Sequence, residues 1–286
     1  MLKKQVRFFM DEVRSLCRDG KKMPMVNLFP GDSYDTPAAA PRGIIDRLLF
    51  DSRYYFLVKN FNIFKRTGKC ARKGELDAEH QVYFSNMNIR LVEQCGGRIH
   101  LKGLDNLNTK EPFVLIGNHM SSLETALFHA IARPRIDFTF VIKRSLFSVP
   151  YFGDIMRALK AIPVDRENPR DDFKAILADG KALLESGRCL ILFPQATRNE
   201  KFMPESFNSI GVKLARAANV RIIPFALKTD FLGNGRFIRD FGPIRRDRHI
   251  HFEFGAPISV QGNGKAEHQQ IIDFIQSRLS QWGHQS

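Results

Sequence analysis

From residue 98 onward, short apolar runs alternate with stretches of helical periodicity, and this alternation constrains the fold more than any other feature. The apolar runs, rich in β-branched and aromatic residues, cover 98–104, 112–119, 138–143, 161–166, 189–194, 221–227 and 249–255. Helices are predicted near 122–132, 150–159, 170–186 and 207–218, with a closing helix over 265–281. Alternating strands and helices are typical of an α/β domain, so we expect a mostly buried mixed sheet flanked by helices.

The first 95 residues lack this alternation. Residues 1–28 show helical spacing of apolar side chains, and residues 29–43 hold three prolines and two glycines, which predicts a loop or linker. Apolar residues return at helical spacing from Ile44 to Phe56. We therefore expect an N-terminal amphipathic helical segment over 1–95, with its linker at 29–43, and a main domain over 96–286.

The composition fits a folded protein with a large core. Hydrophobic residues make up 43% of the chain and 25 residues are Phe, which excludes a disordered protein. The cysteines, at positions 17, 70, 95 and 189, are too scattered for a disulfide framework or a Cys-based zinc site. A reducing, cytoplasmic setting is the simpler expectation.

The chain is strongly basic, which favours an anionic partner. Its 44 Lys and Arg against 30 Asp and Glu give a formal charge of +14. Nucleic acid, an anionic membrane surface and a phosphorylated substrate all suit such a charge. No apolar run reaches about 18 residues, so no transmembrane helix is expected, and the N-terminus does not read as a secretory signal.

A basic cluster follows the helical pattern of the N-terminal segment. Five Lys and Arg lie between Lys65 and Lys73, beside an aromatic and amphipathic stretch. Such a segment can lie in a membrane interface. The alternative is a helix that packs on the main domain beside a solvated loop.

The stretch GNHMSSLET (117–125) places a histidine where an apolar strand gives way to a helix. Open α/β sheets place their active sites at such junctions. His119 and Glu124 can meet if His119 lies in the turn and Glu124 in the first helical turn; the carboxylate would then orient the imidazole as a general base. Alternatively, Ser121 and Glu124 have the spacing of a capping box, and Glu124 only caps its own helix.

Cationic residues follow other predicted strands. Lys143, Arg166 and Arg198 each come after an apolar run, so all three can reach the same sheet edge as His119 and hold a phosphate. Pro224 lies inside a predicted strand, which suggests a sheet edge or a bulge. His249 and His251 share one strand face, but no further ligand pair is evident and three arginines lie nearby, so we expect no metal site.

Taken in order, these stretches resemble the blocks of the lysophospholipid acyltransferase family, the PlsC-like glycerolphosphate and 1-acylglycerol-3-phosphate acyltransferases. The resemblance covers roughly residues 98–260. The first block, Asn-His-x4-Asp, is matched with Glu in place of Asp, and the third, Phe-Pro-Glu-Gly-Thr-Arg, is matched by FPQATR. The matching positions are Asn118, His119, Glu124, Lys143, Asp165, Arg166, Phe193, Pro194, Gln195, Thr197, Arg198 and Pro224.

The resemblance implies an enzyme of glycerolphosphate acyltransferase-like fold that transfers an acyl group from acyl-CoA or acyl-carrier protein to a lysophospholipid hydroxyl. The expected acceptor is 1-acylglycerol 3-phosphate, giving phosphatidate. His119 would be the general base and Glu124 its partner, while Lys143, Arg166 and Arg198 would bind phosphate. No cofactor beyond the acyl donor is implied.

Three departures from the family pattern leave alternatives open. Glu124 is longer than Asp, Gln195 removes a negative charge, and Ala196 disfavours positive φ. The acceptor could be another lysolipid, such as a lyso-ornithine lipid, or the chain could be a non-catalytic basic protein that binds membranes or nucleic acid. We expect no nucleic-acid partner and a peripheral or monotopic protein on the cytoplasmic face of an anionic membrane.

Overall fold

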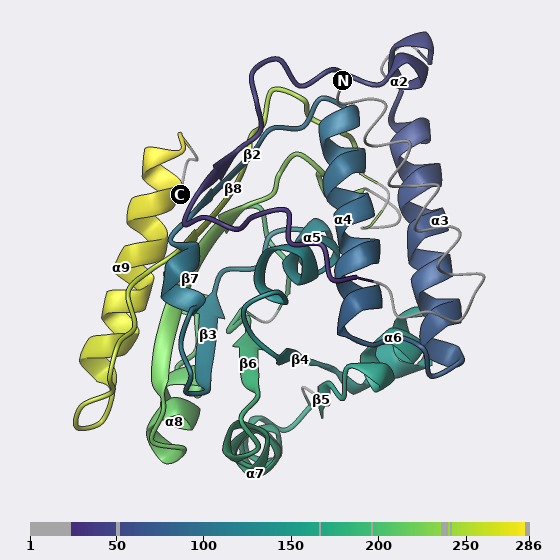
Figure 1. Cartoon of the computed structure of the whole chain (residues 1–286). Coiled ribbons are helices and arrows are strands. Elements are labelled where there is room, and N and C mark those ends of the chain that lie inside the picture. The colour runs from purple at the N-terminus through teal and green to yellow at the C-terminus, as the bar shows by residue number, and fades with distance from the viewer. Residues whose placement is uncertain are drawn as a thin grey trace.

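The described residues form an eight-stranded mixed sheet (Figure 1). The computed structural model describes residues 24–49, 52–165, 167–195, 197–235, 240 and 242–283. The strand order is β1-β2-β8-β7-β3-β6-β4-β5. The strands are β1 (Tyr34–Asp35), β2 (Ile99–Lys102), β3 (Phe113–Gly117), β4 (Phe138–Lys143), β5 (Ile162–Val164), β6 (Cys189–Leu192), β7 (Arg221–Lys228) and β8 (Ile250–Phe254).

Five neighbouring strands run in one direction. β7, β3, β6, β4 and β5 pair in parallel, whereas β8 is antiparallel to β7 and parallel to β2. β3 and β6 are apolar and buried at every position, as expected for central strands covered on both faces. The carboxyl ends of the five parallel strands therefore share one edge of the sheet, which we call the strand-end edge.

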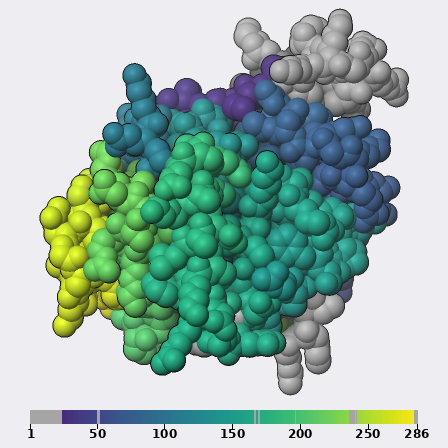
Figure 2. Space-filling model, turned by 90° about the horizontal axis from the view of Figure 1, so that it is seen from below, coloured from purple at the N-terminus to yellow at the C-terminus, as the bar shows by residue number. Residues whose placement is uncertain are grey.

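Helices cover both faces of the sheet. They are α2 (Ile44–Leu48), α3 (Arg53–Arg72), α4 (Ala78–Gln94), α5 (Leu123–Ala132), α6 (Phe152–Ala158), α7 (Pro169–Glu185), α8 (Ile210–Ala217) and α9 (Lys265–Gln281). α7, α8 and α9 pack on one face, while α4 packs on α5, and α3 on both α4 and α6. α9 (yellow) and the helices around α3 (blue) lie at opposite ends of the molecule (Figure 2).

A cluster of aromatic rings forms the centre of the core. Phe128 of α5 lies within 6.2 Å of the ring centroids of Phe138 and Phe140 in β4, Phe225 in β7, and Phe252 and Phe254 in β8. Most of these contacts are edge-to-face, the arrangement that aromatic quadrupoles favour. α5 is thereby fixed against three strands, and its N-terminus is held at the strand-end edge.

The predicted strands and helices of the main domain are confirmed, with end shifts of a few residues. Four other expectations are corrected or qualified by the structure: three lie nearer the N-terminus and one lies in β7. The predicted linker 29–43 contains β1, which pairs with β2, because Tyr34 and Asp35 are extended and hydrogen-bonded there. Residues 24–28 contain no helix, and residues 1–23, where the rest of that predicted helix falls, lie outside the described part of the chain.

The basic cluster is not a loop. Its residues up to Arg72 belong to α3, whose first turn is capped by the Ser52 hydroxyl accepting from the Tyr54 amide. Gly68 of α3 lies against Tyr151, where an added Cβ would come within 2.4 Å of the Tyr151 Cβ. The close contact of α3 with the segment leading into α6 therefore depends on this glycine. The division at residue 95 stays a prediction.

Pro224 is not at a sheet edge, because β7 lies between β8 and β3. The alternative, a bulge, is confirmed by the register. Phe225 pairs with Phe254, but Ile222 bridges Ile258, so the second segment holds one more residue than β7 between the two pairs. The missing N–H of Pro224 therefore falls where the ladder is already interrupted.

Candidate active site

The strand-end edge gathers most of the predicted site residues. His119 follows β3, Phe193 to Arg198 follow β6, Lys143 ends β4, and Asp165 follows β5. Since these strands are parallel neighbours, their ends face the same side of the sheet. Arg166 and Ala196 lie outside the described residues, so their expected places are not tested.

His119 and Glu124 are in direct contact. His119 lies in the turn after β3, Glu124 lies in the first turn of α5, and Glu124 Oε2 accepts a hydrogen bond from His119 Nδ1. The Glu124 side chain is fully buried, whereas 20% of the His119 side chain is exposed. Nε2 is thereby left as the imidazole nitrogen able to accept a proton from a bound group.

The second oxygen of Glu124 is held by three donors. Oε1 accepts from the amides of Met120 (2.8 Å) and Ser121 (2.5 Å) and from the hydroxyl of Thr229 (2.6 Å). The amide bonds correspond to the capping interaction, and Oε2 makes the histidine contact, so both predicted roles of Glu124 occur together. These donors replace the water that a buried carboxylate loses.

Three residues that follow β6 hold the His119 segment. The Phe193 ring stacks on the imidazole, with centroids 4.3 Å apart and planes 22° apart. The Gln195 side-chain oxygen accepts from the His119 amide at 2.7 Å, and the Asn199 amide donates to the His119 carbonyl at 3.0 Å. A glutamate at this position would offer the same kind of acceptor oxygen. Gln195, which stands in place of the Glu of the family pattern, therefore keeps this hydrogen bond without the negative charge.

The Asn118 side-chain amide joins the His119 turn to β7 by two hydrogen bonds, as the backbone of a neighbouring strand residue would. Its amide nitrogen donates to the Leu227 carbonyl (2.8 Å), and its amide oxygen accepts from the Leu227 N–H (2.9 Å). Gly117 allows this close approach, since an added Cβ would come within 2.5 Å of the Phe225 carbonyl oxygen. The sequence Gly-Asn-His thus fixes the imidazole between β7 and the β6 turn.

Two of the predicted phosphate ligands, Lys143 at the end of β4 and Arg198 after β6, lie at the same edge of the sheet. Arg198 pairs with Asp240, and Asp165 accepts from Arg144 Nε at 2.7 Å. Lys143 is exposed and makes no ion pair within the described part of the chain. Two strand spacings separate β4 from β3, about 10 Å, so Lys143 is placed for a ligand that extends along the edge.

The remaining motif residues after β6 are Pro194 and Thr197. The Pro194 carbonyl accepts from the Asn208 side chain at 2.5 Å, which ties the β6 turn to the start of α8. Thr197 is exposed in that turn. Thr229 was not among the predicted site residues, but its hydroxyl donates to Glu124 Oε1. The sequence pointed to Thr229 only through its position directly after β7.

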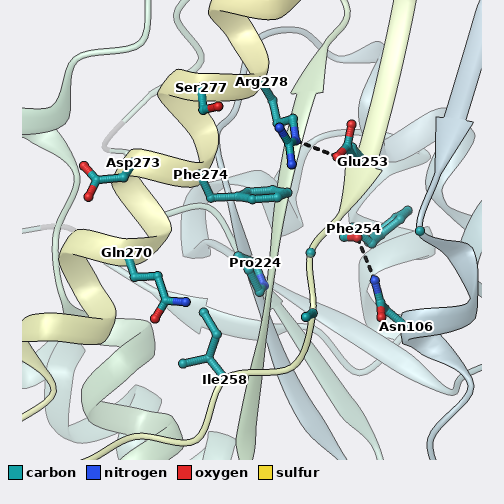
Figure 3. Close-up of a pocket in the computed structure, with 13 residues that line it drawn as sticks. Asn106, Pro224, Glu253, Phe254, Ile258, Gln270, Asp273, Phe274, Ser277 and Arg278 are labelled. Carbon is teal, nitrogen blue, oxygen red and sulfur yellow. Dashed lines mark hydrogen bonds and ion pairs between the residues drawn. The ribbon is translucent and has the colours of Figure 1, made fainter.

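A hollow of about 660 Å³ lies away from this edge (Figure 3). It is lined by Pro224 of β7, Phe254 at the end of β8 and Phe274 of α9, beside an ion pair of 2.5 Å between Arg278 and Glu253. Of the predicted site residues that the structure describes, only Pro224 borders it. The hollow is thus separate from the His119–Glu124 pair.

Comparisons with known proteins agree with this geometry. Residues 98–228 match the model of the family described as Acyltransferase. The 1-acyl-sn-glycerol-3-phosphate acyltransferase of Pseudomonas aeruginosa is 32% identical over 188 residues, covering 66% of this chain and 68% of that protein. The enzyme of the same name from Streptococcus pneumoniae is 26% identical over 206 residues, 72% of each chain.

A solved structure has the same fold. The crystal structure of the 1-acyl-sn-glycerophosphate acyltransferase PlsC from Thermotoga maritima matches with a TM-score of 0.64 at 15% identity, over 85% of this chain and 98% of that one. The family model and the relative that is 32% identical show that the chain is an acyltransferase. The chain belongs to the lysophospholipid acyltransferase family, of the PlsC type.

Proposed function

We propose that the chain transfers an acyl group from an acyl thioester to the free hydroxyl of 1-acylglycerol 3-phosphate, giving phosphatidate. The observation that carries the proposal is the His119–Glu124 pair, buried on the carboxylate side and open on the imidazole side at the strand-end edge. The names of the bacterial relatives support this acceptor.

His119 acts as general base in the proposed reaction. Its Nε2 takes the proton of the acceptor hydroxyl as that oxygen attacks the thioester carbonyl and forms the new C–O bond. Glu124 stabilises the resulting imidazolium through Nδ1. The C–S bond then breaks, and the imidazolium returns the proton to the departing thiolate, so no acyl-enzyme is formed.

Cationic groups along the edge bind the phosphate of the acceptor. Arg198 pairs with Asp240 in this structure, and 22% of its side chain is exposed. A phosphate that carries more charge than one carboxylate competes with Asp240 for this guanidinium. Lys143 and Arg166 complete the proposed phosphate site from β4 and from the segment after β5.

The deciding experiment supplies the purified full chain with labelled acyl-CoA or acyl-carrier protein and a panel of lysolipids. We expect transfer to 1-acylglycerol 3-phosphate in preference to a phosphate-free acceptor such as a lyso-ornithine lipid. Arg198→Ala should raise the KM for the phosphorylated acceptor and leave that for the phosphate-free one unchanged. Absence of transfer to every acceptor would contradict an active enzyme, and preference for a phosphate-free lipid would contradict the acceptor.

In this proposal, α2 and the first half of α3 contact the membrane surface. Exposed apolar side chains gather there, namely Ile44, Ile45, Leu48, Leu49, Tyr54, Val58 and Phe61. Asp46, the acidic residue of α2, is buried and bound by Arg42 and Arg246, so the outer face of α2 presents only apolar and basic groups. This combination suits an anionic bilayer surface. The described helices include none with the length and apolarity to cross a bilayer.

Liposome co-sedimentation tests the membrane proposal. Replacement of Ile44, Leu48 and Leu49 by Ser should release the full chain from anionic vesicles, whereas Met203→Ser, at an exposed apolar residue elsewhere, should not. A parallel titration with duplex DNA tests the nucleic-acid alternative. Vesicle binding that survives the triple substitution would place the attachment on another surface.

A further inference from the structure

Three histidines outside the strand-end edge converge on one point of the surface. His100 of β2 pairs in register with His251 of β8, and His249 comes directly before β8. His100 Nε2 lies 3.0 Å from His249 Nδ1. One ring nitrogen from each of the three lies within 4.8 Å of the others. Residues about 150 positions apart thus bring three imidazole donors together.

The surroundings hold two of these rings in place. The Asp35 carboxylate of β1 accepts a hydrogen bond from His100 Nδ1, so the free Nε2 is the nitrogen directed at His249. Carboxylates orient metal-binding histidines in this way and raise their basicity. His251 stacks on Trp282, with ring centroids 4.8 Å apart and planes 13° apart.

The nearby arginines oppose a cation less than their sequence positions suggest. Arg245 pairs with Glu200 at 2.6 Å, and Arg246 pairs with Asp46 at 2.9 Å. Arg248 lies 3.8 Å from Asp230, which also binds Lys228 Nζ at 2.8 Å. Each of these three guanidinium groups therefore has a carboxylate partner, with Asp230 shared between Arg248 and Lys228. The charges of Lys228, Arg98 and Lys102 also act on the rings, so a bound cation would have to be held by its imidazole bonds against them.

We propose that His100, His249 and His251 bind one borderline divalent cation, such as Zn²⁺, through their imidazole nitrogens. Tetrahedral zinc with Zn–N bonds of about 2.0–2.1 Å separates its ligand nitrogens by about 3.3 Å, close to the 3.0 Å between His100 and His249. Water would fill the fourth position. The ion would connect β2 to β8, and through Trp282 to the end of α9, as a structural site.

Zinc binding by the untagged, EDTA-treated full chain tests the proposal. Calorimetric titration with Zn²⁺ should give one ion per chain, and saturating Zn²⁺ should raise the Tm by roughly 5 °C or more. His249→Ala, at an exposed ring, should weaken binding by at least about tenfold, as should Asp35→Asn. His80→Ala is the matched control, because His80 also contacts an aspartate but lies in no cluster.

Trp282, the single tryptophan of the chain, offers a second readout. Because it stacks on His251, Cu²⁺ should quench its fluorescence saturably at one equivalent, Zn²⁺ should compete, and His249→Ala should abolish the effect. Circular dichroism checks that each variant is folded. Lack of saturable Zn²⁺ binding by the wild type would overturn the proposal. So would Zn²⁺ binding by His249→Ala and His251→Asn that is as tight as binding by the wild type.

Discussion

The His119–Glu124 and His100–Asp35 pairs both join a histidine to a carboxylate through Nδ1, and they differ in what surrounds the pair. At the strand-end edge, the Glu124 carboxylate is fully buried beneath His119. At the β1–β2 pair, the Asp35 carboxylate beneath His100 is 71% exposed. Water screens the second pair and not the first, so the same contact has different strength in the two places.

The groups facing the free nitrogens differ as well. His100 Nε2 faces a second imidazole at 3.0 Å, whereas His119 presents its ring beside the turn after β6. A carboxylate–histidine pair is thus not by itself evidence of a base. Burial of the carboxylate and an open Nε2 suit proton transfer, while a cluster of nitrogens suits a metal ion. Substitutions can separate the two cases.

The largest effect is expected from His119→Ala. Loss of the general base should lower kcat/KM by about 10³-fold, within the range found for proton-transfer groups. His80→Ala, at a partly buried histidine bound to Asp77, should leave activity unchanged. Steady-state kinetics with 1-acylglycerol 3-phosphate give the answer, and an active His119→Ala enzyme would mean that another group takes the proton.

A smaller loss is expected from Glu124→Gln. The amide keeps one acceptor for the Met120 and Ser121 N–H groups but removes the charge that stabilises the imidazolium. We expect kcat to fall about 100-fold with the fold retained. Glu124→Asp, which restores the residue of the family pattern, is the matched variant. Wild-type kcat in Glu124→Gln would leave Glu124 with its capping role alone.

Thr229→Val should cost about tenfold in kcat. Its hydroxyl donates to Glu124 Oε1 at 2.6 Å, and a hydrogen bond to a charged group contributes about 1.5–3 kcal/mol. Because Thr229 acts through Glu124, kcat should fall while KM stays constant, and Thr229→Ser should recover the rate. A change in thermal stability with unaltered kcat would instead indicate a purely structural contact.

Local pattern was sufficient for most of the fold. Strands buried on both faces read as apolar runs, so β3 and β6 were evident, and the turn between β3 and α5 placed His119 and Glu124 correctly. What the pattern does not contain is pairing between distant strands. The contact of His100 with His249 depends on β2 lying beside β8, and that of Thr229 with Glu124 on β7 lying beside β3.

The smallest effect concerns a third histidine, which has no carboxylate. His129, on the same helix as Glu124, is buried and stacks on Phe138. Burial and the Arg133 charge lower its pKa to about 3, against about 6.5 in the unfolded chain. The unfolded state therefore binds the extra proton, and the stability that neutral His129 contributes above pH 6.5 is lost as the pH falls towards 3.

Urea unfolding between pH 7 and pH 4.5, with EDTA present, measures this loss. The free energy of unfolding of the wild type should fall by up to about 1.4 kcal/mol more per pH unit than that of His129→Gln, which cannot titrate. His129→Gln should be less stable at pH 7, since it replaces a ring that packs on Phe138. Parallel pH profiles would show that His129 takes up its proton over the same pH range in the folded and the unfolded chain, and that burial of this histidine carries no pH dependence.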